Sequence, residues 1–316
     1  MTTKKRHHYV PKAYLKPFTD AQGRVLVYRK DDPAKVLHVS PDGTGFERYY
    51  YSQPTPDGGV DHNRLEDLFS QTEGLWPAVV ERLRRGEDVN DTLPLIFEFM
   101  LLQRVRVPAS RDATEAKLAA QVHQTMLDLV ASGMLPPPPS ALVGRLDEVI
   151  VSIDPHKSIH GMVDDVFGSR SVFESIGLCA IQNRTDTPFL TSDNPVIWFD
   201  PTAPVSELQP YAISAGGPVM LLFPVSPTTI LVGATERMAG FKEHGLMYGE
   251  TTDEDWVFRV NVEVCRFAYK AVYANKPGLE GMVAAFADES PVWQRDGGAG
   301  RLVFGRREVK PKWEPK

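Results

Sequence analysis

The feature that most constrains this chain is a segment from about Thr92 to Val107 that is apolar nearly all round and runs into Gln103-Arg-Val-Arg-Val-Pro-Ala-Ser-Arg111. A helix that is apolar on every side is buried inside its domain, and Pro108 is expected to stop this one. One arginine in a last turn needs no function, because cations favour the helix dipole there. Three arginines and a glutamine at a buried end need partners, since unpaired buried charge is costly. The natural candidates are three acids elsewhere in the chain: Glu66, Glu73 and Asp193.

The N-terminal run Arg6–Phe18 (RHHYVPKAYLKPF) interleaves histidines, tyrosines and prolines with basic residues. A terminal tail is usually polar and low in aromatics, so this one is expected to be held by packing. Its counterpart is Pro188–Pro195 (PFLTSDNP), a polar cluster between apolar residues. We expect both segments to meet beside the arginine end of the buried helix.

The hydrophobic pattern predicts an α+β fold in a single domain, 1–316. Residues 1–60 are predicted as a small β-meander, 61–175 as helical, and 176–316 as a mainly antiparallel sheet. The helix that starts near Asp61 is expected to be kinked or divided by Gly74 and Pro77. Further helices are predicted at 112–132, at 141–153 and from Pro155, and strands in the last part at 176–182, 188–191, 196–199, 220–224, 229–232 and 262–267.

Composition and charge limit the class of protein. The net charge is −6, from 35 Lys and Arg against 41 Asp and Glu, which argues against a surface that is basic throughout. The basic residues at the two ends of the chain fit a phosphate-bearing ligand or nucleic acid, but simple solvation of the ends explains them more readily. No run approaches ~18 apolar residues and the start lacks an apolar leader, so no membrane partner is expected. Cys179 and Cys265 are interpreted as small buried hydrophobes in a reducing, cytoplasmic setting.

These motifs together resemble the DUF4238 family. The resemblance rests, in chain order, on HHYVPKAYLKPF near the start, Leu65-Glu66 with Glu73, QRVRVPASR, PFLTSDNPV and the late Phe223-Pro-Val-Ser-Pro227. The chain departs from the family pattern at Val107, where the QxxRTP-like element has Thr, but Gln103 and Arg106 remain. The resemblance covers nearly the whole chain and implies that the dispersed segments act as one unit.

The first hypothesis from the residues is a metal-assisted hydrolase of a phosphate-containing substrate, preferably a nuclease or phosphoesterase. Hard cations such as Mg²⁺ or Mn²⁺ take carboxylates and an occasional imidazole and activate water. The predicted metal ligands are His8, Glu66, Glu73 and Asp193. The predicted catalytic residues are His8, Glu73 and Asp193, with Arg106 stabilising developing charge. The predicted substrate contacts are Tyr9, Gln103, Arg104, Arg111, Ser192 and Asn194, the arginines binding phosphate oxygens.

Two alternatives remain open. In a metal-free enzyme, Ser192 or Asp193 would act on a small substrate with His8 as base, although no nucleophile elbow surrounds Ser192. In a non-catalytic protein, Ser192-Asp-Asn-Pro195 would be an Asx-type turn whose carboxylate pairs with the arginines, and the chain would bind nucleic acid or a partner.

Two other site types are disfavoured by the sequence. The sequence has no P-loop, GxGxxG or GxSxG, so no nucleotide cofactor is expected. A metal site at the helical pair His156 and His160 is disfavoured, because no Glu follows in the HExxH manner.

Overall fold

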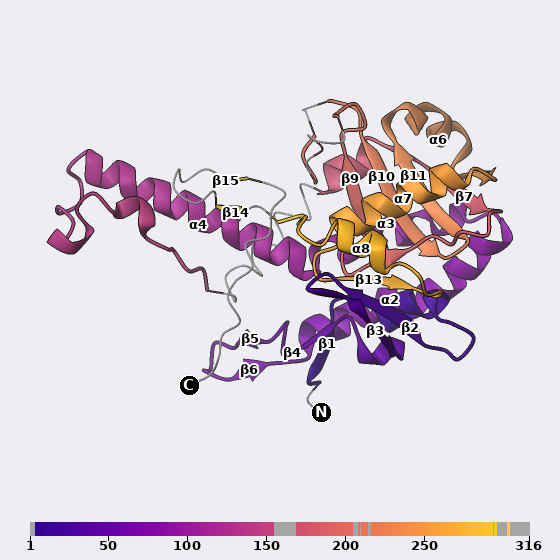
Figure 1. Cartoon of the computed structure of the whole chain (residues 1–316), viewed down its shortest axis with the longest axis horizontal. Coiled ribbons are helices and arrows are strands. Elements are labelled where there is room, and N and C mark those ends of the chain that lie inside the picture. The colour runs from indigo at the N-terminus through magenta and orange to yellow at the C-terminus, as the bar shows by residue number, and fades with distance from the viewer. Residues whose placement is uncertain are drawn as a thin grey trace.

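The computed structural model describes residues 4–154, 169–204, 208, 210–213, 216–292, 294–295 and 302–303. The predicted α+β class is confirmed: N-terminal strands, a helical middle and C-terminal strands follow one another along the chain (Figure 1). One long helix, α4 (Pro108–Ala131), projects from the remainder as an arm.

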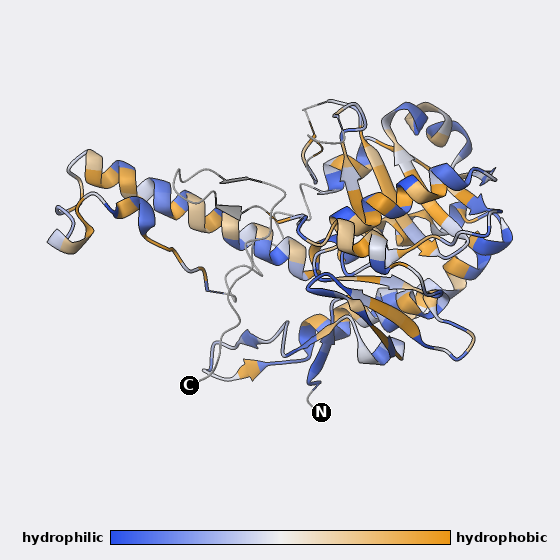
Figure 2. Ribbon diagram, in the orientation of Figure 1, coloured by the Kyte–Doolittle hydropathy of each residue, from blue (hydrophilic) through white to orange (hydrophobic). Residues whose placement is uncertain are grey.

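The larger sheet is built from the second half of the chain. Its strand order is β12-β7-β11-β10-β9, antiparallel throughout except for the parallel pair β12 and β7. Its strands are largely buried, as in β11, where every residue is covered, and Figure 2 shows hydrophobic residues concentrated on them. The strands are β7 (Gly177–Asn183), β9 (Ile197–Phe199), β10 (Met220–Ser226), β11 (Thr229–Ala234) and β12 (Met247–Thr251).

The smaller sheet joins distant parts of the chain. Its order is β3-β2-β13-β8, with all pairs antiparallel, so the N-terminal hairpin shares a sheet with later strands. This pairing places Ser192, at the end of β8, beside Val272. The strands of this sheet are β2 (Val25–Arg29), β3 (Asp32–Val39), β8 (Thr191–Ser192) and β13 (Ala271–Ala274). Other strands form separate two-stranded ribbons: β1 (Arg6–His8) with β4 (Phe46–Arg48), β5 (Gln53–Pro54) with β6 (Val60–Asp61), and β14 (Gln294–Arg295) with β15 (Leu302–Val303).

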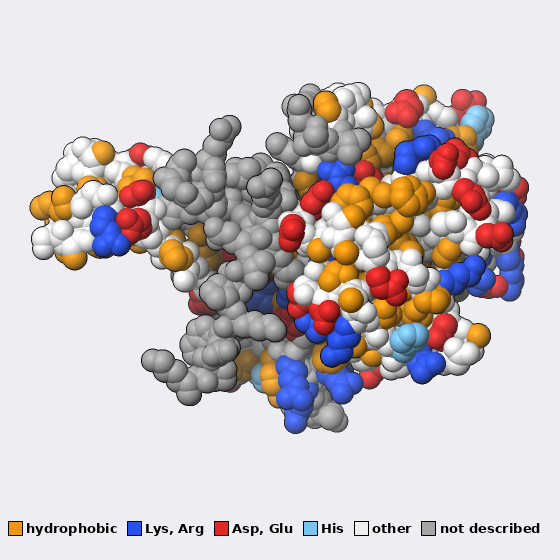
Figure 3. Space-filling view, viewed as in Figure 1, with side chains coloured by type: hydrophobic (Ala, Val, Ile, Leu, Met, Phe, Trp, Pro, Cys, Tyr) orange, Lys and Arg blue, Asp and Glu red, His pale blue; other side chains and the backbone are white. Residues whose placement is uncertain are grey.

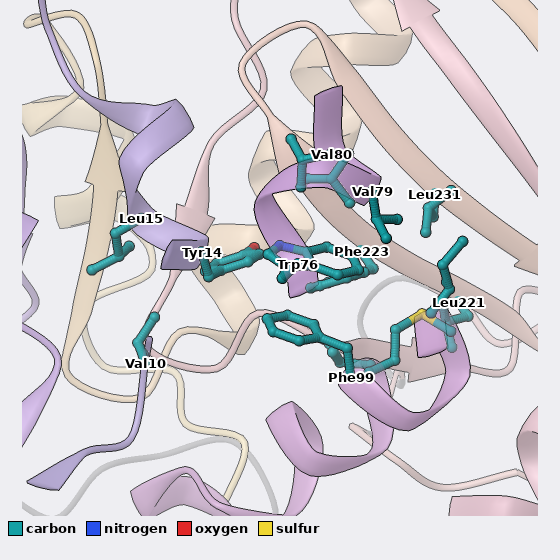
Figure 4. Packing of buried hydrophobic residues seen from close by; sticks show 14 of the residues in the cluster. Val10, Tyr14, Leu15, Trp76, Val79, Val80, Phe99, Leu221, Phe223 and Leu231 are labelled. Atoms are coloured by element: carbon teal, nitrogen blue, oxygen red, sulfur yellow. The ribbon is translucent and has the colours of Figure 1, made fainter. Parts of the chain in front are cut away.

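The main core lies where α2 (Arg64–Arg85) and α3 (Leu93–Val105) meet α1 (Lys12–Leu15) and the larger sheet. Trp76 stacks on Phe99 with ring centroids 3.9 Å apart, and Tyr14 stacks on Phe223 at 5.4 Å (Figure 4). Residues 169–174 are helical. The remaining helices are α6 (Met238–His244), α7 (Glu254–Phe267) and α8 (Glu280–Ala285), with 3₁₀ turns at Lys16–Phe18, Pro41–Gly43, Asn90–Thr92, Ser140–Leu142, Leu146–Glu148 and Thr235–Arg237.

Two predictions about local structure were wrong, and of the predicted kink or division of α2 only the division is contradicted. The segment 262–267, predicted as a strand, is the end of α7. The buried residues of α7 recur with helical spacing from Val257, and the Asp253 side chain caps the helix by accepting from the Trp256 amide at 3.0 Å. The helical periodicity and the cap therefore decide the structure here against the preference of β-branched residues for strands. The helix predicted at 141–153 is two short 3₁₀ turns, separated at Gly144, whose φ is +73°. Helix α2 continues through Pro77 undivided.

Other expectations have mixed outcomes. Cys179 and Cys265 are buried and free, as predicted. Within the described residues, no helix combines the length and apolar character that crossing a bilayer requires. The helix predicted from Pro155 and the pair His156 and His160 lie outside the described residues.

The hydroxyl of Tyr14 is expected to contribute measurably to stability. It donates to the Pro224 carbonyl and shares a hydrogen bond with Thr191 Oγ1, both at 2.6 Å and fully buried. Tyr14→Phe should lower the free energy of unfolding by about 1–3 kcal/mol, because both partners lose a buried hydrogen bond. Urea unfolding measures this, with the partly exposed Tyr49→Phe as control. Equal stability of the two variants would contradict the role assigned to Tyr14.

Candidate functional site

The N-terminal segment is bound by the guanidinium of Arg106, at the end of α3. The Arg106 side chain is 2% exposed. Its Nε donates to the Tyr9 carbonyl at 3.0 Å, its Nη2 to the His8 carbonyl at 2.8 Å, and its Nη1 to the Glu73 carboxylate at 2.7 Å. Every nitrogen of the side chain is therefore engaged by the chain itself, and the predicted arginine–acid pairing is present between α2 and α3.

Neighbouring groups hold the same segment. Gln103 Nε2 donates to the Tyr9 carbonyl at 3.0 Å, so that oxygen accepts two side-chain hydrogen bonds. The Val10 amide donates to the Gly45 carbonyl at 3.0 Å. Gly45 has φ +65°, and a Cβ there would lie 2.9 Å from Val10 Cβ, so the close approach requires glycine.

An aromatic layer completes the end of α3. The Tyr51 hydroxyl donates to the Arg106 carbonyl at 3.0 Å, which satisfies one of the carbonyls that a helix leaves unpaired at its C-terminus. His7 Nδ1 accepts from the Tyr51 amide at 2.8 Å, and the two rings stack at 5.7 Å. Neither role of Tyr51 was predicted, because the aromatic run at 46–51 indicates only an extended segment.

The SDNP turn is closed from water. Asp193 is 0% exposed, and its carboxylate accepts from the backbone amides of Tyr269 at 2.8 Å and Lys270 at 2.7 Å. Burial raises the pKa of Asp193 above its ordinary value, while the two amides oppose the shift. Ser192 Oγ accepts from the Asn194 amide at 3.1 Å, so the serine stabilises the turn. The Asp193 carboxylate therefore accepts hydrogen bonds from backbone amides. The non-catalytic hypothesis had instead paired this carboxylate with the arginines.

Asn194 and Arg104 meet on the other side of that turn, around Tyr211. Asn194 Nδ2 donates to the Tyr211 hydroxyl at 2.6 Å and to the Phe267 carbonyl at 2.8 Å. The guanidinium carbon of Arg104 lies 3.7 Å from the Tyr211 ring centroid and 5.3 Å from that of Trp198. Burial raises the pKa of the Tyr211 hydroxyl, and the charge of Arg104 opposes this. No motif near Arg104 in the sequence predicts that Tyr211 and Trp198 lie beside its guanidinium.

The third arginine, Arg111, belongs to α4. Its Nε donates to Glu115 at 3.2 Å, its Nη1 donates to the Tyr50 carbonyl at 3.2 Å, and its guanidinium lies over the Tyr50 ring. Its predicted role in phosphate binding would require it to leave these partners.

Glu66 and His8 retain buried atoms without partners, Glu66 Oε1 and His8 Nε2. Burial raises the pKa of the Glu66 carboxyl; Arg106 and the His8 amide lower it, and Glu73 raises it further. Burial also lowers the pKa of the His8 imidazole, with the charge of Lys12 acting in the same direction. Both shifts are in the direction of the neutral form.

The predicted metal ligands do not gather into one coordination sphere. Among the described residues, no three His, Cys, Asp or Glu side chains come together in an arrangement that could hold a metal ion. Glu66 and Glu73 border the Arg106 guanidinium, whereas Asp193 is enclosed by Tyr269 and Lys270. The structure brings together His8, Tyr9, Glu66, Glu73, Gln103 and Arg106 as one group, and Ser192, Asp193, Asn194 and Arg104 as another.

The fold and this site define an α+β protein whose N-terminal strand is bound by an arginine of a buried helix. The chain matches the family "Protein of unknown function (DUF4238)" over residues 6–278, and it belongs to that family. Comparison with curated proteins finds no match, and comparison with solved structures finds none either.

Removal of the Arg106 guanidinium should cost much more stability than removal of an exposed one. Arg106→Met leaves the His8 carbonyl and Glu73 without this donor and the Tyr9 carbonyl with Gln103 alone, and loss of one member of a buried pair costs about 3–5 kcal/mol. Arg85, which pairs with Glu81 at the surface, is the matched control, and Arg85→Met should change the free energy of unfolding by about 0–1 kcal/mol. Urea unfolding of both variants measures the difference; similar values would show that Arg106 does not hold the segment.

Glu66→Gln should show a pH-dependent gain in stability. Because the folded-state pKa of Glu66 lies above its ordinary value of 4.5, protonation favours the folded state. Its stabilising contribution is fully present below pH 4.5 and is lost as the pH rises through the folded-state pKa. Glutamine cannot ionise, and it retains an oxygen that accepts from the His8 amide. The free energy of unfolding of Glu66→Gln should therefore exceed that of the wild type as the pH rises from 4.5 through the folded-state pKa, and the two should be equal at lower pH.

Urea unfolding at several pH values tests the role of Glu66, with Glu81→Gln on the exposed face of the same helix as control. A Glu66→Gln variant that is less stable than the wild type at neutral pH would contradict the expectation. Such a result would mean that the carboxylate has a partner, such as a metal ion.

Proposed function

We propose that this chain is a non-catalytic binding protein in which the cluster around Arg106 holds the fold together. The observation that carries the proposal is the engagement of Arg106: all three of its nitrogens donate to groups of the same chain. A catalytic arginine must instead offer donors to charge that develops on a substrate. Asp193 is equally unsuited to turnover, because it is enclosed and both its oxygens accept backbone amides.

A small molecule or a protein partner fits the charge distribution better than nucleic acid. Three basic groups near the N-terminus face acids: Lys4 lies 2.8 Å from Asp67, and Arg6 and Lys12 lie 3.0 and 2.6 Å from Asp42. On the face shown in Figure 3, basic and acidic side chains are interspersed. Binding to a phosphate backbone favours instead a patch of uncompensated Lys and Arg.

A pocket beside α3 offers room for a small ligand. It is an open pocket of about 440 Å³, a volume typical of ligand sites. Its wall is formed by α3, the helical residues 169–174, Ile176 and α6, with the apolar side chains Phe97, Leu101, Phe173, Ile176, Met238 and Phe241 and the charged side chains Glu98, Arg170 and Glu174.

The test of the proposal combines an activity screen with a binding assay. Purified protein should show no nuclease or phosphatase turnover with Mg²⁺ or Mn²⁺, and a fluorescent apolar probe such as anilinonaphthalene sulfonate should bind in the pocket. Leu101→Trp, which narrows the pocket, should weaken the probe's binding. Turnover that is abolished in folded His8→Ala and Asp193→Ala variants would refute the non-catalytic proposal.

A metal-assisted phosphoesterase is the second candidate, and the unpartnered Oε1 of Glu66 and Nε2 of His8 favour it. Mg²⁺ and Mn²⁺ need few protein ligands, and Glu66 with Glu73 could supply two oxygens while waters complete the sphere. Titration of Mn²⁺ followed by electron paramagnetic resonance separates the candidates. Stoichiometric binding lost in Glu66→Gln would favour the phosphoesterase, and absence of binding would exclude it.

A further inference from the structure

Arg104 differs from the two neighbouring arginines, Arg106 and Arg111. Its side chain is nine-tenths buried, yet its Nε and Nη1 have no hydrogen-bond partner. Across the parts of the chain that the structure describes, no carboxylate lies within ion-pair distance of it, whereas Arg106 pairs with Glu73 and Arg111 with Glu115. Because an uncompensated buried charge is costly, this guanidinium calls for an anion.

The aromatic rings beside Arg104 satisfy only part of that need. Tyr211 and Trp198 meet edge to face at 4.8 Å, and both rings lie near the guanidinium carbon. A ring face attracts a cation, but it does not replace the oxygen acceptors that the N–H groups had in water. The rings thus hold the charge in place and leave its donors free.

Two further unmatched polar atoms border the same tyrosine. Trp198 Nε1 is a buried donor and Asn194 Oδ1 a buried acceptor, and neither has a partner. Asn194 is oriented by its bonds to the Tyr211 hydroxyl and the Phe267 carbonyl. The cluster therefore presents unmatched N–H donors from two side chains together with one unmatched acceptor.

We propose that Arg104, Trp198 and Asn194 form a binding site for a small oxyanion, either a phosphate or the carboxylate of a small acid. The oxygens of either anion accept from the guanidinium and the indole, and a phosphate that retains a proton also donates to Asn194 Oδ1, which a carboxylate cannot do. Tyr211 is only partly buried, whereas the unmatched atoms themselves are covered, so the anion reaches them by displacing the side chains that cover them. The inference goes beyond the proposed function, since a binding protein and an enzyme could both use such a site.

The test is thermal unfolding of the full chain with inorganic phosphate, sodium acetate or sodium benzoate, with chloride used to keep ionic strength constant. Phosphate or one of the carboxylates should raise the unfolding midpoint of the wild type in a saturable way, because a ligand that binds only the folded state stabilises it. Arg104→Met should raise the Kd at least about tenfold, because it removes charge-assisted hydrogen bonds. Arg111→Met, which removes a paired arginine, should keep the response.

Trp198→Phe tests the proposal even where Arg104→Met does not fold, because this variant keeps an aromatic ring and removes only the indole donor. This variant should bind the anion several-fold more weakly, and the anion-dependent change in tryptophan fluorescence should disappear. A response to phosphate alone assigns a phosphate-bearing ligand, and a response to a carboxylate alone assigns a small acid. A wild type that responds to neither, or an Arg104→Met variant that responds like the wild type, would overturn the proposal and leave water as the partner of these groups.

Discussion

The structure depends on the contact between Arg106 and the backbone of the first strand. A guanidinium offers five donors in a fixed plane, and this one uses them to bind two consecutive carbonyls, of His8 and Tyr9, and the carboxylate of Glu73. The N-terminal strand, α2 and α3 are therefore held at one buried point. The cost of burying the charge is offset because the acid and the oriented carbonyl oxygens replace its water.

Asp193 has the corresponding role for the second half of the chain. Its carboxylate accepts the amides that lead from α7 into β13, and its own amide donates to the Ala271 carbonyl at 3.1 Å. The turn that carries it follows β8, which lies beside β13 in the sheet that also contains the N-terminal hairpin. Arg106 and Asp193, residue types that are common in active sites, are here hydrogen-bonded to backbone groups of the same chain.

The sequence predicted those features of the fold that depend on local hydrophobicity and charge. The nearly all-apolar α3 was expected to be buried and its arginines to have acid partners, with Glu66, Glu73 and Asp193 as the candidates; of these, Glu73 pairs with Arg106. The partners of Arg104 could not be found in this way, because Trp198 and Tyr211 are brought to it only by the fold. Composition misled at 262–267, where β-branched residues occupy the buried face of α7. Of the carboxylates predicted as metal ligands, Glu66 and Glu73 lie beside Arg106 whereas Asp193 lies apart from them, and spacing in a sequence cannot report which distant acids converge.

The most direct measurement of the central claim is hydrogen–deuterium exchange of the segment 6–10 in the native protein. If Arg106 and Gln103 bind this segment to the core, its amides should exchange only with global unfolding, at rates like those of the Trp76 region in α2. The exposed turn at Asp57–Gly59 should exchange fast. Protection of residues 6–10 comparable to that of the buried helix would support the account, whereas exchange as fast as that of the exposed turn would contradict it.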